Sequence, residues 1–105
     1  MTSASGALSH ECHMGVHRIA LSGTLTMDSV GAMYGQLKPF EAGATLVVDA
    51  SAVTRADSSA LALMTTLMRR AREQSMRVDL KPLPQALSAI IQIYGLQDIL
   101  GTGDA

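Results

Sequence analysis

The sequence is poor in several residue types that common functional classes require. It has no tryptophan, 3% aromatic residues and a single cysteine, Cys12, in 105 residues. Cys12 cannot form a disulfide within the chain, which favours a reducing compartment. Few aromatics means few stacking platforms for single-stranded nucleic acid, and a formal net charge of -1 provides no basic field for DNA or RNA. We therefore expect no nucleic-acid partner.

Long hydrophobic runs are also lacking. No stretch approaches the roughly 18 apolar residues of a membrane span, and residues 1–6 lack the basic and apolar parts of a signal peptide. We expect a cytoplasmic protein that does not insert directly into a membrane. The sequence does contain 48% hydrophobic residues, including seven Met. This composition suits one aliphatic, Met-filled core in a single domain over residues 1–105.

Hydrophobic patterning predicts an α/β domain with the element order β-β-α-β-α-β-α and one mixed sheet of four to five strands. A turn at Met14-Gly15 joins the first two strands, and residues 51–55 are expected to form a loop. Residues 1–6 and 101–105 are expected to be flexible. The predicted strands cover residues 7–13, 16–22, 45–50 and 76–83, the last with Met76, Val78 and Leu80 on one face.

Two of the three predicted helices are recognised by an apolar stripe and by their ends. The first is capped by Asp28 or Ser29 and ends near Lys38, before Pro39; its stripe is Val30, Met33, Tyr34 and Leu37. The last begins at Pro84 and ends with Gly95 at the left-handed position after the helix, followed by Leu96. Its stripe is Leu87, Ile90, Ile91 and Tyr94.

The middle helix, from Asp57-Ser58-Ser59 to about Gln74, is the most informative element. Its spacing predicts a core face of Ala60, Leu63, Met64, Leu67 and Ala71. The opposite, outward stripe holds Ser58, Ala62, Thr65, Arg69 and Arg72, with Leu61 and Met68 at the margins. One explanation of this stripe is that it is simply the solvated side of the helix. Ser58 would then cap the helix start, and the arginines would complement the negative end of the helix dipole. The alternative is a flat docking surface with the Ser58 hydroxyl at its centre.

The sequence lacks complete sets of metal ligands and of catalytic residues. On one continuous strand His13 and His17 would share a face and Cys12 would point to the other, so we expect no metal site, and the role of the His10/His13/His17 segment stays open. Ser58 follows Asp57, but no His lies in the second half of the chain, and nucleophile-elbow and phosphate-loop motifs are missing. We expect no enzymatic activity and no cofactor.

Residues 46–61, LVVDASAVTRADSSAL, resemble the core signature of the STAS domain: a buried strand ending in Asp, a short loop, and a helix start that carries a functional hydroxyl. The similarity continues through residues 69–72 and 76–80 to Tyr94-Gly95-Leu96, and spans about residues 16–100. The sequence departs from the family at Ala60, where Gly is usual. A methyl group there could crowd a partner that packs against this position.

The resemblance implies a non-enzymatic protein-interaction module with Ser58 as the contact or regulatory hydroxyl. Its surroundings would be Asp57, Ser59, Leu61 and Ala62, with Thr65 and Arg69 farther along the helix. The Tyr94-Gly95-Leu96 ending is most similar to the small cytoplasmic STAS subunit of the Mla phospholipid ABC transporter, whose partner would be the ATPase subunit, peripheral to the inner membrane. The alternative is an anti-sigma factor antagonist, phosphorylated at Ser58 by an anti-sigma factor kinase.

Overall fold

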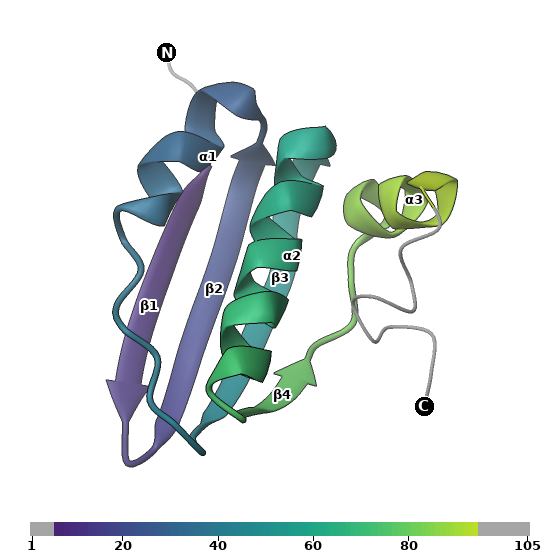
Figure 1. Ribbon diagram of the computed structural model, residues 1–105. Coiled ribbons are helices and arrows are strands. Elements are labelled where there is room, and N and C mark those ends of the chain that lie inside the picture. The colour runs from purple at the N-terminus through teal and green to yellow at the C-terminus, as the bar shows by residue number, and fades with distance from the viewer. Residues whose placement is uncertain (1–5, 95–105) are drawn as a thin grey trace.

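The computed structural model describes residues 6–94 and confirms the predicted α/β architecture and element order. The elements are β1 (Ala7–His13), β2 (Val16–Leu25), α1 (Met27–Tyr34), β3 (Thr45–Ala56), α2 (Ser58–Glu73), β4 (Arg77–Leu80) and α3 (Gln85–Tyr94). They form one domain in which α2 lies between α1 and α3 (Figure 1). Within the described residues, no helix combines the length and apolarity needed to cross a membrane.

The sheet has four strands in the order β1-β2-β3-β4. β1 and β2 form an antiparallel hairpin, whereas β3 is parallel to both β2 and β4, so the sheet is mixed as predicted. The hairpin turn places Met14 at φ 52° and Gly15 at φ 77°, the two positive φ values that tight two-residue turns require. Side chains alternate between a buried helix-covered face and a polar open face. The buried face includes Leu8, Ile19, Leu21, Leu46 and Val48.

β2 and β3 run farther than their sequence pattern indicates. The expected loop at residues 51–55 is wrong, because β3 continues to Ala56 and stays paired with β2, with Ser22 opposite Ala52 and Leu25 opposite Ala56. Two register shifts, between Ala20 and Ser22 and between Gly23 and Thr24, interrupt the ladder. After each irregularity, the side chains that follow point to the opposite face of the sheet. The alternation of apolar and polar residues is therefore broken, and a pattern of period two does not identify the rest of the strand.

Helix α1 differs from its prediction at both ends. It begins at Met27 with Thr26 as N-cap, two positions before Asp28 and three before Ser29, the expected caps. The Thr26 backbone N–H donates to the Ser29 hydroxyl oxygen at 3.1 Å, and that hydroxyl donates to the Thr24 carbonyl. The helix ends at Tyr34, before Gly35, rather than near Lys38, consistent with the low helix propensity of glycine.

Three of the four residues of the expected apolar stripe lie on α1, and the fourth, Leu37, follows the helix. Val30 and Met33 are buried, and Tyr34 and Leu37 pack against the core while partly exposed. α1 therefore joins the common core through the side that its spacing predicts.

The C-terminal elements are shorter or later than expected. β4 covers Arg77–Leu80 instead of residues 76–83, and it pairs with Thr45 to Val48 of β3. Val78 is 38% exposed, so the expected apolar face of this strand is only partly buried. In α3, which follows Pro84, Leu87 and Ile91 are buried and Ile90 is partly so. The expected cap at Gly95-Leu96 and the side chain of Tyr94 lie outside the described residues, as do most of the two ends expected to be flexible.

Candidate functional site

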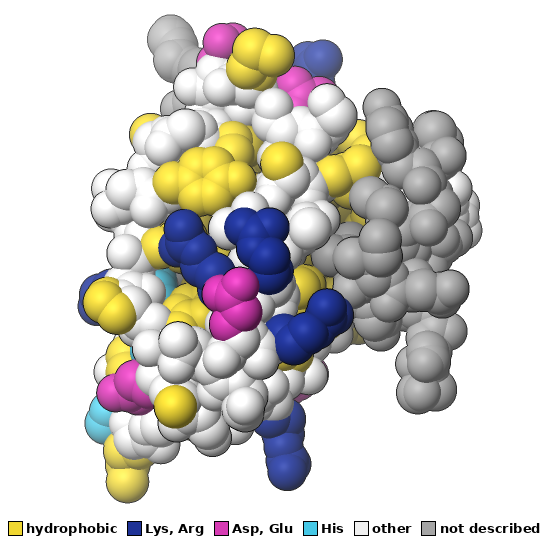
Figure 2. Space-filling model, viewed as in Figure 1, with side chains coloured by type: hydrophobic (Ala, Val, Ile, Leu, Met, Phe, Trp, Pro, Cys, Tyr) yellow, Lys and Arg dark blue, Asp and Glu magenta, His cyan; other side chains and the backbone are white. Residues whose placement is uncertain are grey.

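The two faces of α2 are those that its spacing predicts. The core face, Ala60, Leu63, Met64, Leu67 and Ala71, has 0% exposure at every position. Ser58, Ala62, Arg69 and Arg72 are exposed, and Thr65 is half-buried. Figure 2, which looks onto this side of the molecule, shows Lys and Arg side chains gathered over the C-terminal half of the helix. The outward stripe is thus small and polar at its start and cationic toward its end.

The expected marginal position of Leu61 and Met68 is wrong. They are 5% and 7% exposed and belong to the hydrophobic core. Because α2 is flanked by α1 on one side and α3 on the other (Figure 1), its buried arc is wider than that of a helix on a bare sheet. Neither residue contributes to a contact surface.

Asp57 joins the starts of two helices through one carboxylate. Its Oδ1 accepts from the Ser59 backbone N–H at 2.8 Å, which caps α2. Its Oδ2 accepts from the Met27 backbone N–H at 3.2 Å, at the first residue of α1. The Asp57 N–H donates to the Leu25 carbonyl at 3.1 Å, at the end of β2. Asp57 therefore fixes both helix starts at the end of the parallel strands.

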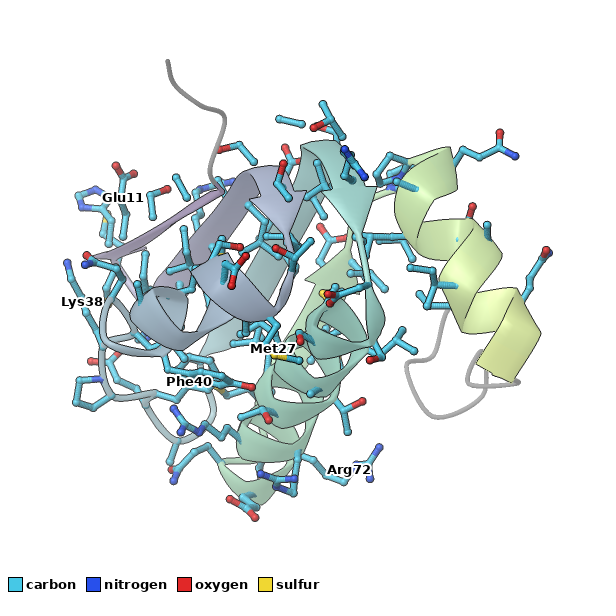
Figure 3. All side chains as sticks on the ribbon, turned by 90° about the horizontal axis from the view of Figure 1, so that it is seen from above. Glu11, Met27, Lys38, Phe40 and Arg72 are labelled. Carbon is cyan, nitrogen blue, oxygen red and sulfur yellow. The ribbon has the colours of Figure 1, made fainter. Side chains whose placement is uncertain are left out.

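The resulting exposed surface at this end, here called the helix tip, consists of Met27, Ser58, Ala62 and Thr65. Met27 is 78% exposed, one of the most exposed large hydrophobic side chains described. Seen from this end, Met27 lies between α1 and α2 (Figure 3). The Ser58 hydroxyl makes no side-chain hydrogen bond to another residue between positions 6 and 94. The tip therefore offers the exposed Ser58 hydroxyl together with the exposed Met27 side chain, whose backbone N–H is bound to the neighbouring Asp57.

Other residues expected at the site fall outside the tip. Ser59 contributes its backbone N–H to the Asp57 cap and is half-buried. Arg69 is exposed on the same stripe, but it lies 11 residues after Ser58, roughly 16 Å along the helix at about 1.5 Å per residue. Ala60 is fully buried, so its methyl group does not crowd a partner. Sequence reasoning missed Met27, because its position depends on α1 starting beside Asp57.

A second polar cluster lies at the opposite end of β1 and β2, near their hairpin turn. Here the expected placement of the histidines is wrong: His10 and His17 are 5% and 1% exposed. Cys12 pairs directly with His17 across the hairpin, so these two share a face, and His13 pairs with Val16 on the other. The reversal of the chain at the turn, which a continuous-strand pattern ignores, produces this arrangement.

The hydrogen bonds of this cluster determine which imidazole nitrogens carry the protons. The Lys38 backbone N–H can only donate, and it meets His10 Nδ1 at 2.8 Å. His10 therefore carries its proton on Nε2 and donates to His17 Nδ1 at 2.9 Å. His17 in turn donates from Nε2 to Glu41 Oε1 at 3.2 Å. All four ring nitrogens of His10 and His17 thus have a hydrogen-bond partner.

Burial lowers the pKa of His10 below its ordinary value, and the nearby His17 and Lys38 lower it further. Partial desolvation raises the pKa of the Cys12 thiol, with the charge and hydrogen bond of Glu41 adding to the effect. Both groups are therefore favoured in their neutral forms.

The architecture agrees with that of a known protein family. A family model described as "Mlab, STAS domain" matches residues 9–101. The chain belongs to the STAS domain family. The crystal structure of an anti-sigma factor antagonist from Mycobacterium paratuberculosis is similar, with a TM-score of 0.56 and 24% sequence identity over 90% of this chain and 81% of that chain. That likeness shows the shared STAS fold. No curated protein matches this sequence with comparable significance.

Proposed function

We propose that this protein is a non-enzymatic accessory subunit of an Mla-type phospholipid ABC transporter, and that its helix tip binds the transporter's ATPase subunit. The exposed Ser58 hydroxyl beside the exposed Met27 carries the proposal. The family model named for the Mla-type STAS domain and the Tyr94-Gly95-Leu96 ending of the sequence favour this branch. The protein would be cytoplasmic, held at the inner membrane by its partner.

The tip is suited to protein contact because it is held rigidly. The Asp57 carboxylate fixes two helix starts, so little conformational freedom is lost when a partner binds. An exposed Met adapts to irregular apolar surfaces, while a serine hydroxyl supplies a directional hydrogen bond. Polar and apolar groups side by side are typical of protein interfaces.

The position of the histidines supports a non-catalytic role. A serine nucleophile needs a general base within hydrogen-bond reach. The sequence has three His, at positions 10, 13 and 17, on the hairpin whose turn lies at the other end of β2 from Ser58. Asp57 is already committed to two backbone N–H groups. The tip is thus equipped for binding rather than for turnover.

Affinity purification from the native cell tests this function. The wild-type protein should recover an ABC ATPase subunit, and Ser58→Arg should lose it because a long cation blocks the tip. Ser51→Arg is the matched control, since Ser51 is exposed on β3 away from the tip. Recovery of an anti-sigma factor kinase in place of the ATPase, or equal recovery by Ser58→Arg, would contradict the assignment.

An anti-sigma factor antagonist is the second candidate, favoured by the accessibility of the Ser58 hydroxyl. A phosphate there would meet the positive end of the α2 dipole, but it would also face the Asp57 carboxylate and enlarge the contact surface. Ser58→Asp should then weaken kinase binding by about 1–3 kcal/mol. Intact mass analysis of the protein from its native cell should show a phosphorylated species, and persistent absence of that species together with normal binding by Ser58→Asp would reject this candidate.

A further inference from the structure

We infer that Cys12, His17 and Glu41 form a zinc-binding site, here called the hairpin site, at the end of the molecule opposite the helix tip. The three residues come from β1, from β2 and from the segment between α1 and β3. Their donor atoms all lie within 4.8 Å of one another. The inference does not depend on the proposed function.

The separations of the three donor atoms match a zinc coordination sphere. Zinc bonds of about 2.3 Å to sulfur and about 2.0–2.2 Å to nitrogen and oxygen, at tetrahedral angles, place ligand atoms roughly 3.3–3.6 Å apart. Cys12 Sγ and His17 Nε2 are 3.4 Å apart, His17 Nε2 and Glu41 Oε1 are 3.2 Å apart, and Cys12 Sγ and Glu41 Oε1 are 3.8 Å apart. Only movements of a few tenths of an ångström would be required.

The donor set indicates the metal. One sulfur, one imidazole nitrogen and one carboxylate oxygen suit zinc, whereas magnesium and calcium prefer oxygen ligands alone. Three protein ligands leave a fourth position, which Cys12 and Glu41 keep open toward solvent because both are exposed. His17, by contrast, is 1% exposed and held by neighbouring rings. With the imidazole buried and the sulfur and carboxylate exposed, an ion can reach all three ligands from solvent without unfolding the hairpin.

Neighbouring residues orient the imidazole. His17 Nδ1 lies 2.9 Å from His10 Nε2, so a second ring supports the nitrogen that would not bind the metal. Phe40 packs against both rings with centroids 5.7 Å apart. It lies with Lys38 on the segment between α1 and β3 (Figure 3). The second ring that would support a metal-binding His17 is thus already in place beside it, and it accepts from His17 Nδ1 once its own proton has moved to the other nitrogen.

Zinc binding requires specific proton movements. The Cys12 thiol loses its proton to solvent and the sulfur lone pair bonds to the ion. The proton of His17 passes from Nε2 to Nδ1, and that of His10 passes from Nε2 to Nδ1, so both rings remain neutral. The Lys38 N–H then faces the new His10 N–H and must leave its present hydrogen bond. One proton is therefore released for each ion, and the Lys38 backbone responds to binding.

Cobalt and zinc titrations of the untagged full chain test the site. Co²⁺ should bind in a 1:1 ratio with a sulfur-to-cobalt charge-transfer band and with release of one proton, and Zn²⁺ should then displace the Co²⁺ without further proton release. Cys12→Ser should remove the band, and Glu41→Gln should weaken binding about tenfold or more, the scale of effects around metal sites. Both positions are exposed, so these variants should retain the wild-type circular dichroism spectrum.

Two controls make the outcome decisive. His13→Asn changes an exposed histidine outside the site and should bind as the wild type does, as should Ser58→Arg at the helix tip. In an amide NMR spectrum, the Lys38 signal should shift on addition of zinc to the wild type and stay unchanged in Cys12→Ser. The absence of a charge-transfer band, equal affinity in Cys12→Ser, or loss of binding in His13→Asn would overturn the inference.

Discussion

Replacement of Asp57 by Ala should destabilise the protein through two helices at once. The N-cap on Ser59, at 2.8 Å, contributes about 1 kcal/mol, within a range of about 0.5–2 kcal/mol for such caps. The bond to the Met27 N–H, at 3.2 Å, adds about 0.5–1.5 kcal/mol. We therefore expect the free energy of unfolding to fall by roughly 1.5–2.5 kcal/mol. A loss of 2 kcal/mol corresponds to a decrease in Tm of about 8–16 °C for a domain of this size.

Urea unfolding monitored by circular dichroism measures this effect, and two variants separate its parts. Asp57→Asn keeps one acceptor for the Ser59 cap and loses the acceptor for Met27, so about 0.5–1.5 kcal/mol should disappear. Ser58→Ala, next in sequence but exposed, should change stability by less than about 0.5 kcal/mol. The reasoning is refuted if Asp57→Ala unfolds within about 0.5 kcal/mol of the wild type.

Four further changes test other parts of the structure. Ser75 has φ 54° after α2, so Ser75→Gly should stabilise by about 1 kcal/mol in urea unfolding; no gain would contradict the left-handed ending. Met14→Asn, at φ 52° and 87% exposed, should raise Tm by a few degrees, and a lower Tm would contradict the turn geometry. Leu67→Ala, at 0% exposure, should cost about 2–5 kcal/mol on chemical unfolding, and a near-neutral result would place Leu67 outside the core. Finally, the lowered pKa of His10 means that the unfolded chain binds more protons, so stability measured with a chelator should decline as pH falls below about 6.5; equal stability at pH 7.5 and 5.5 would contradict the neutral chain of imidazoles.

Helix α2 shows what the sequence can predict. Its start, length and two faces follow from local spacing and from the Asp57 cap, and the structure reproduces them. The end of α2 uses a Schellman motif, with the Met76 N–H donating to the Ala71 carbonyl at 2.9 Å and the Ser75 N–H to the Arg72 carbonyl at 3.0 Å. The sequence does not predict this motif, because the left-handed position is occupied by Ser75, whereas glycine is usual there.

Three features of the site that the sequence did not predict correctly share a non-local cause. Leu61 is buried because α1 and α3 flank α2, and helix spacing contains no information about neighbours. Cys12 meets His17 because the hairpin turn pairs residues of odd and even number on one face. Met27 lies at the helix tip because its backbone N–H donates to the carboxylate of Asp57, the residue before Ser58 and 30 positions later in the chain. Each of these contacts depends on tertiary packing, which a pattern within one element does not specify.

The helix tip and the hairpin site lie at opposite ends of β2, one at Leu25 and the other at His17. Variants at one end should therefore leave the other functional, since residues well apart with no shared partners act almost independently. This separation allows the role of the tip to be measured in proteins whose metal binding is unchanged.

Calorimetric titration of the purified protein with the ABC transporter ATPase proposed as its partner tests the central claim, that the exposed helix tip is the binding surface. Ser58→Arg should weaken the interaction by at least tenfold, about 1.4 kcal/mol, while Ser51→Arg should bind like the wild type. Wild-type affinity in Ser58→Arg would contradict the account.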